Sequence, residues 1–308
     1  RMRLNLWLLL ACLAFAVAAC GGDSLDEKDS GGSSGGDKGK PSVTVGSANF
    51  PENTLLAEIY AGALEAKDFK VTKKLNIGSR ETIFPAMERG DLTLLPEYTG
   101  TLLSFVTKGK AKATDTQAQV AELKSALPAK LTMLEPSAAE DKDTVTCTKE
   151  VVDKYQLKSL DDLAKVSKNV TMGGPPEMPK REGFGLKGLK EIYGIDFKKF
   201  RPLDVAGPLT VSALKSGKVD CADLFSTQSA IPANGFITLE DPKGIVAHEN
   251  VTPLIAKDKA TPEVSDVLNG VSAKLTTENL KELVKRVEID KDDAKAVADD
   301  FLSQNGLK

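Results

Sequence analysis

Few residues in this 308-residue sequence could perform catalysis. His248 is the only histidine, so a metal site with two imidazole ligands is excluded. The sequence contains no nucleophile elbow, Walker A loop or glycine-rich dinucleotide fingerprint. The run from Gly173 to Pro176 fails as a phosphate loop, because its prolines lack the N–H groups that such a loop supplies. A hydrolase that uses His248 as its base stays open, but the sequence favours a protein that is not an enzyme and that needs neither a metal nor a cofactor.

Two polar turns suit ligand binding better than catalysis. Asn49 and Phe50 follow an apolar strand predicted from Val43, and Ser79 and Arg80 follow a strand predicted at 71–77. Each turn leads into a predicted helix, whose free N–H groups and dipole favour anions. N-capping would explain either turn alone, and Arg80 could simply pair with a neighbouring acid. Both turns, however, lie at the carboxyl ends of neighbouring strands, where open α/β sheets bind ligands.

The elements that position these turns alternate between short apolar runs and amphipathic stretches. Helices predicted at 53–66 and 81–88 alternate with strands at 71–77 and 92–95, which is typical of a parallel α/β sheet. A second alternation begins near Asp143 and runs to about Glu240, and 261–307 is predicted to be mostly helical. The sequence therefore predicts two α/β lobes.

The N-terminus predicts export. Arg1 and Arg3 precede an apolar run too short to span a membrane, which indicates a signal peptide at 1–19. The segment that ends at Cys20 resembles a bacterial lipobox, so Cys20 is expected to be lipidated; a plain cleaved signal is the alternative. Residues 20–41 are rich in Gly and Ser and predict a flexible tether. We expect the protein on the outer face of the bacterial cytoplasmic membrane.

Cysteine and charge usage narrow the possibilities further. Cys147 and Cys221 lie in strand-like segments of a chain expected to be exported, so one disulfide or two separate buried thiols are both open. The 41 Lys and Arg residues are interspersed among 44 Asp and Glu residues, which gives a net charge of −3 and no basic stripe. Nucleic acid is therefore not expected as a partner.

Several motifs resemble those of one known family. The segment from Val43 to Glu52 and the run Pro96 to Thr101 resemble the glycine betaine/choline/carnitine-binding proteins of osmoprotectant ABC importers. The resemblance covers about residues 42–308. It continues through Glu177, Arg181, Gly188 and Leu189, Tyr193 and Gly194, Asp204, 213–217, Val219 and Asp220, Ser226 and Thr227, and 239–241.

This resemblance implies a type II periplasmic-binding fold, in which two crossover strands join two lobes around a ligand cleft. Lobe 1 would comprise 42–142 with 249–308, and lobe 2 would comprise 143–248. It also implies a monomer that binds a small solute and then docks on a permease that works with an ATPase. A lipoprotein that presents its ligand state to a receptor, without transport, is the alternative.

The resemblance also implies which side chains hold the ligand. Tyr98 would contribute to an aromatic cage for a quaternary ammonium group, Thr101 a hydroxyl, Asp143 an acidic group and Arg181 a carboxylate-binding guanidinium. The full implied set is Asn49, Phe50, Ser79, Arg80, Tyr98, Thr101, Asp143, Val145, Arg181, Phe225, Thr227 and Glu249.

Three cage positions depart from the family pattern. Tyrosine is expected at the positions of Val145, Phe225 and Glu249, and only Phe225 keeps an aromatic ring. Each desolvated cation–π contact is worth up to about 2 kcal/mol. The sequence therefore predicts weaker glycine betaine binding than in relatives with a complete cage, and Arg80 favours a more polar or larger ligand.

Overall fold

The computed structural model describes residues 40–113 and 115–308. The predicted signal peptide, Cys20 and nearly all of the tether lie outside the described residues. No helix in the described part is long and apolar enough to cross a membrane.

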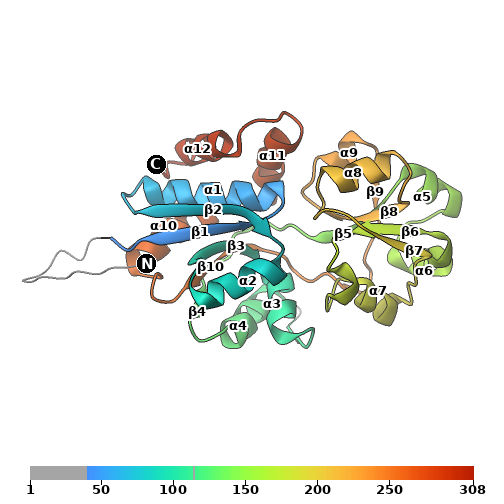
Figure 1. Cartoon of the computed structure of the whole chain (residues 1–308), viewed down its shortest axis with the longest axis horizontal. Coiled ribbons are helices and arrows are strands. Elements are labelled where there is room, and N and C mark those ends of the chain that lie inside the picture. The colour runs from blue at the N-terminus through green and yellow to red at the C-terminus, as the bar shows by residue number, and fades with distance from the viewer. Residues whose placement is uncertain (1–39, 114) are drawn as a thin grey trace, which may run out of the picture. The chain divides into compact units, whose positions relative to one another are not determined.

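Residues 40–308 contain two five-stranded sheets, one in each lobe (Figure 1). Lobe 1 contains β1 (Val43–Ala48), α1 (Pro51–Glu65), β2 (Val71–Gly78), α2 (Arg80–Arg89), β3 (Leu94–Tyr98), α3 (Thr99–Thr107), α4 (Thr116–Ala126), β4 (Leu131–Met133), β10 (Val251–Ala256), α10 (Pro262–Ser272), α11 (Thr277–Glu288) and α12 (Ala294–Gln304). Lobe 2 contains β5 (Asp143–Cys147), α5 (Lys149–Tyr155), α6 (Leu160–Val166), β6 (Thr171–Gly174), α7 (Leu186–Tyr193), β7 (Lys199–Pro202), α8 (Pro208–Lys215), β8 (Cys221–Phe225), α9 (Ala230–Ala233) and β9 (Ile237–Thr238).

The two sheets share one topology. The order is β2-β1-β3-β10-β4 in lobe 1 and β7-β6-β8-β5-β9 in lobe 2. In each sheet the first three strands are parallel, and the fourth, which enters from the other lobe, is antiparallel to both of its neighbours. The parallel strands expected from the sequence form three of the five strands in each sheet, and the antiparallel strand is the one that crosses between the lobes. A strand that crosses between lobes enters its new sheet at the edge where the parallel strands end, so it must run the opposite way.

Helix α1 forms the centre of lobe 1. The helix is apolar on two sides, so it can pack between the sheet and helices α10, α11 and α12. Gly62 allows α12 to approach closely, since a Cβ at this position would lie 2.8 Å from Leu302 Cδ1. Helices α2, α3 and α4 lie on the opposite face of the sheet (Figure 1). Helices α3 and α4 were not predicted from the sequence.

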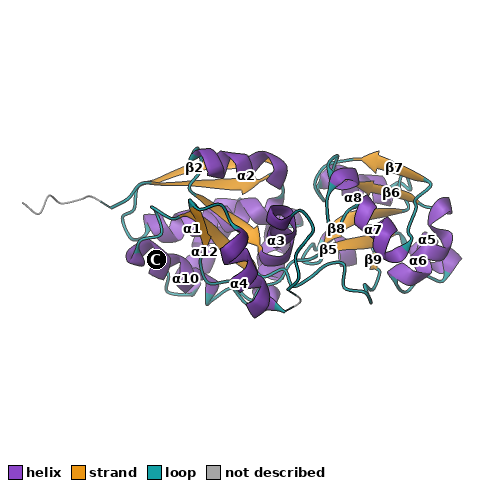
Figure 2. Cartoon of the chain, turned by 90° about the horizontal axis from the view of Figure 1, so that it is seen from below, coloured by secondary structure: helices purple, strands orange, loops and turns teal. Residues whose placement is uncertain are grey.

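Lobe 2 has a separate core on each face of its sheet. Residues of α5, α6 and α7 fill one core, and residues of α8 and the segment before β9 fill the other. Figure 2 shows this lobe from below, with helices on both sides of its strands. A disulfide joins Cys147 of β5 to Cys221 of β8, which face each other directly in the antiparallel ladder.

The two crossovers run antiparallel beside each other. Glu140 pairs with Asn250 in an isolated bridge, and Asp141 N–H donates to the Glu249 carbonyl oxygen at 3.1 Å. The first crossover leads into β5 and the second into β10. Each of these strands begins within one or two residues of the joint.

Candidate ligand-binding cleft

The topology brings the predicted ligand residues to one edge of each sheet. In lobe 1 the parallel strands β1 and β2 end at Ala48 and Gly78, directly before predicted ligand residues, and β3 ends at Tyr98, which is itself one of the predicted set. Antiparallel β10 starts at the same edge, just after Glu249. In lobe 2 the end of β8 and the start of β5 place Phe225 opposite Asp143. The two edges face each other across the crossovers.

A small cavity of about 50 Å³ lies where these edges meet. Nine residues of the predicted set line it: Asn49, Phe50, Ser79, Arg80, Tyr98, Thr101, Asp143, Arg181 and Phe225. It has room for only one or two water molecules. A solute of the expected size therefore needs the walls to move apart or must extend beyond this cavity.

A larger hollow of about 1060 Å³ adjoins the cavity. Arg80, Thr101, Asp143 and Arg181 line both spaces, and Glu249 lines the larger one. Together they can accommodate a ligand with one end among the aromatic rings and the other end among the charged groups.

Three aromatic rings gather at the cavity. The Phe50 ring centroid lies 4.7 Å from that of Phe225 and 6.3 Å from that of Tyr98. Phe50 belongs to the turn that follows β1. It supplies a third ring beside Tyr98 and Phe225, the two cage positions at which this chain keeps an aromatic residue. The negative faces of such rings attract a cation that cannot donate hydrogen bonds.

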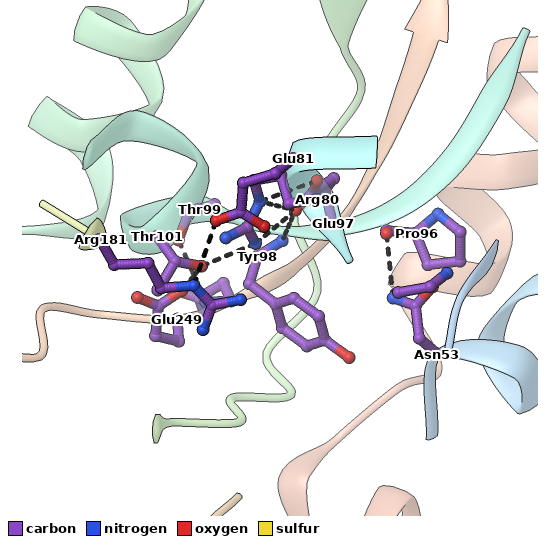
Figure 3. Close-up of polar contacts among 12 residues, drawn as sticks. Asn53, Arg80, Glu81, Pro96, Glu97, Tyr98, Thr99, Thr101, Arg181 and Glu249 are labelled. Atoms are coloured by element: carbon purple, nitrogen blue, oxygen red, sulfur yellow. Dashed lines mark hydrogen bonds and ion pairs between the residues drawn. The ribbon is translucent and has the colours of Figure 1, made fainter. Parts of the chain in front are cut away.

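Arg80 is committed to a buried carboxylate. Its Nε lies 3.0 and 3.1 Å from the two Glu97 carboxylate oxygens, and its Nη2 lies 2.7 Å from Oε2 (Figure 3). Nη2 also donates to Thr101 Oγ1 at 2.9 Å, and Thr101 in turn donates to Glu249 Oε2 at 3.2 Å. Arg80 is thus not a surface residue, and it pairs with the buried Glu97 and not with an acid next to it in the sequence. It anchors a chain of polar contacts along the cavity wall.

Arg181 connects the two lobes. Its Nε donates to Glu81 Oε1 of lobe 1 at 3.2 Å (Figure 3). Its Nη2 donates to Glu177 Oε1 of its own lobe at 3.2 Å. The guanidinium that the family pattern assigns to a ligand carboxylate is held here by carboxylates of the protein itself. A ligand carboxylate would have to share or displace these partners.

Asn53 fixes the ends of two strands. Its side chain donates to the Pro96 carbonyl oxygen at 3.1 Å (Figure 3). It also accepts from Ala48 N–H at 2.8 Å, so it ties the end of β1 to β3. Sequence reasoning missed this residue because an Asn in a first helical turn is common without any such role.

A buried acidic cluster, also missed, joins the lobes beside the aromatic rings. The Glu52 carboxylate accepts from Tyr98 Oη at 2.7 Å and from Thr227 Oγ1. Asp141, on the first crossover, accepts from Thr227 N–H at 3.1 Å. Burial raises the pKa of Glu52, and burial with the nearby Glu52 charge raises the pKa of Asp141 well above its usual value. The first-turn position of Glu52 signals only a helix-dipole contact, so burial here could not be foreseen.

Three predicted residues lie outside the small cavity. Val145 lines a separate hollow with Asp143, and Thr227 is engaged by Glu52 and Asp141. Glu249 accepts a hydrogen bond from Thr101 and lines the larger hollow instead. Gly100 permits this last arrangement, because a Cβ at its position would lie 2.6 Å from Glu249 Oε1 and 2.7 Å from the His248 carbonyl oxygen. The absence of a side chain at Gly100 therefore allows the second crossover to pack closely against the start of α3.

His248 lies on the same crossover. Its ring is about half exposed, and Nδ1 lies 2.8 Å from Glu140 Oε1. The imidazole therefore pairs with a carboxylate of the neighbouring crossover.

The stability of the protein is expected to fall between pH 6 and pH 8 because of Glu249. Burial raises the pKa of this carboxyl from 4.5 to about 8. Its stabilising contribution is therefore fully present below about pH 4.5 and is lost as the pH rises through about 8. Between pH 6 and pH 8 the loss from this group is about 2 kcal/mol in the free energy of unfolding.

Urea unfolding of a Glu249→Gln variant checks this expectation. Between pH 6 and pH 8 the variant should lose about 2 kcal/mol less than the parent chain, whereas Glu263→Gln, at an exposed site on α10, should lose as much as the parent. An unchanged pH dependence in Glu249→Gln would contradict the assignment.

Comparison with known proteins gives a consistent match. A family model described as the substrate binding domain of an ABC-type glycine betaine transport system matches residues 41–304. The chain is 29% identical over 273 residues to the ergothioneine transport permease/ergothioneine binding protein EgtU of Helicobacter pylori (strain G27). That alignment covers 87% of this chain and 48% of the relative, so the chain spans about half of that protein's length.

Other relatives match over nearly their whole length. The chain is 28% identical over 279 residues to the glycine betaine-binding protein YehZ of Escherichia coli (strain K12), which covers 86% of this chain and 90% of YehZ. The solved apo form of YehZ matches with a TM-score of 0.59 and 26% identity, over 86% of this chain and 99% of that one. A crystal structure of a glycine betaine/carnitine/choline ABC transporter protein matches with a TM-score of 0.66 and 24% identity, over 87% and 99%. These matches confirm the two-lobed periplasmic-binding fold predicted from the sequence.

Proposed function

Because the chain belongs to the family of substrate-binding domains of ABC-type glycine betaine transport systems, we propose that it captures a small quaternary ammonium solute between its lobes and delivers it to an importer. Closure of the lobes around the solute would be the signal that the permease reads. The observation that carries the proposal is the convergence of Phe50, Tyr98 and Phe225 on one cavity between the lobes.

The choice of ligand follows from the chemistry of that cavity. Aromatic faces bind a cation without needing hydrogen bonds from it. The relatives carry names that refer to ergothioneine, glycine betaine and carnitine, which all contain a trimethylammonium group. Three rings in place of a fuller cage favour a ligand that gains affinity from further polar contacts, so glycine betaine itself is expected to bind weakly.

The proposal also includes export and lipid anchoring. Members of this family act outside the cytoplasm, and the N-terminal segment ending at Cys20 supplies a lipobox-like signal. Mass spectrometry of the exported chain tests the anchor, because a mature N-terminus other than an acylated Cys20 excludes it.

Phe225→Ala is expected to weaken solute binding roughly 10- to 30-fold, because the variant loses one cation–π face from the cavity. Calorimetric titration of the purified chain with glycine betaine, choline, carnitine and ergothioneine provides the measurement. Phe197→Ala is the matched control, because Phe197 packs in the lobe 2 core away from the cavity. Failure of all four solutes to bind the parent chain would refute the proposed ligand class, and equal affinities in the two variants would refute the role of the ring.

A further inference from the structure

Asp143 is a carboxyl group in the cleft to which no N–H or hydroxyl group of the described residues donates. It is the first residue of β5, is 9% exposed, and lines both the small cavity and the larger hollow. No N–H or hydroxyl group of the described residues donates to its buried Oδ1, and its hydrogen-bonding neighbour is the carboxyl group of Asp223. Buried carboxylate oxygens without partners are rare, because desolvation penalises them.

The cleft's two arginines do not satisfy it. Arg80 donates to Glu97 and Thr101, and Arg181 donates to Glu81 and Glu177. Both guanidinium groups lower the pKa of Asp143 through their charge, but burial outweighs them and raises it. Asp143 is thus a carboxyl group near cations whose hydrogen bonds go elsewhere.

Asp223 supports Asp143 from the neighbouring strand. In the β5–β8 register, Asp143 faces Phe225 and Val145 faces Asp223, so all four side chains lie on one face of the sheet. Asp223 is 2% exposed, and its Oδ1 also lacks a partner. Burial and the neighbouring Asp143 charge raise the pKa of Asp223 well above its usual value. Asp223 therefore keeps the proton and donates it to Asp143, and the other lone pairs of the Asp143 carboxylate remain open to a ligand.

A trimethylammonium group cannot satisfy this acceptor, because it carries no N–H or O–H. We propose that Asp143, positioned by Asp223, accepts a hydrogen bond from an O–H or N–H of the ligand, so that the preferred solute is a quaternary ammonium compound that also bears a hydrogen-bond donor. The inference rests on the proposed function. The position of Asp143, opposite Phe225, places the acceptor next to the ring that faces the cation.

Two pairs of compounds that differ only in the donor test the inference. L-carnitine has a hydroxyl that γ-butyrobetaine lacks, and choline has a hydroxyl that its O-methyl ether masks. A hydrogen bond to a charged group should favour the donor-bearing member of at least one pair by about tenfold or more. Calorimetric titration of the full chain with all four compounds gives these ratios.

Variants assign the preference to Asp143. In Asp143→Ala the favoured ratio should fall to near one; loss of the charge weakens both members of a pair and cancels in the ratio. Asp153→Ala, an exposed change on α5 where Asp153 pairs with Lys149, should leave the ratio unchanged.

The outcomes separate the inference from the function. Equal binding within both pairs by the parent chain overturns the inference and leaves the proposed function standing. A preference that survives in Asp143→Ala also overturns it. Failure of these four compounds and also of glycine betaine and ergothioneine to bind the parent chain overturns the proposed function and the inference with it.

Discussion

Arg80→Ala is expected to lower the free energy of unfolding by about 3–5 kcal/mol. The reason is the carboxylate that it leaves behind. Glu97 is 2% exposed, and three of the hydrogen bonds to its carboxylate come from the Arg80 guanidinium. Without Arg80 this charge stays buried, with only Tyr98 N–H donating to it, at 3.2 Å. Denaturant unfolding of the variant and the parent chain measures the difference.

Two further variants make this test specific. Arg89→Ala removes an arginine whose side chain is 62% exposed and which pairs with Asp91, so it should cost about 1 kcal/mol or less. Replacing both partners, as Arg80→Met with Glu97→Met, should recover much of the loss, because no buried charge is then left unpaired. A loss below about 1 kcal/mol in Arg80→Ala would show that Glu97 finds another partner or water.

Removal of the disulfide is expected to cost about 4 kcal/mol in the free energy of unfolding. Cys147 and Cys221 are 74 residues apart in the sequence, and a cross-link of that span restricts the unfolded chain strongly in the chain-entropy model. Both side chains are fully buried, so Cys147→Ala with Cys221→Ala should be measured as a double variant. Thermal or urea unfolding supplies the comparison.

Reductant is the matched control for this prediction. It should destabilise the parent chain and leave the double variant unchanged. Peptide mapping without reduction should recover the two cysteines in one linked species. Recovery of both as free thiols, or a double variant as stable as the parent chain, would contradict the bridge.

Local sequence signals were sufficient to predict how the lobe edges are built. Asn49, Phe50, Ser79 and Arg80 follow directly from strand ends and helix starts, which are short-range features. All four line the cavity between the lobes. The parallel strands that end there were also predicted, because β-branched runs and amphipathic stretches alternate clearly.

Contacts between distant segments were not predictable in this way. Glu52 is buried because Thr227 reaches it from a position 175 residues away. Asp223 looks like any strand residue until the register places it beside Asp143. The prediction for Arg80 allowed a surface ion pair, since only the fold shows that Glu97 is buried beneath it.

Helix α3 shows a different limit. Thr99 and Thr101 are β-branched and have low helix propensity, so the sequence after β3 did not predict a helix there. The tertiary structure supplies the support: Thr99 Oγ1 donates to the His248 carbonyl oxygen, and Leu102 and Leu103 are buried in the lobe 1 core.

The crossovers carry a constraint on how this protein can change its ligand. Asp141, Asp143 and Glu249 lie in or directly beside the two segments that join the lobes, and these segments bond to each other through backbone groups. If the cleft binds its ligand as we propose, a substitution at these positions is expected to change both ligand recognition and the stiffness of the joint. Selectivity and ease of closure would then be coupled traits.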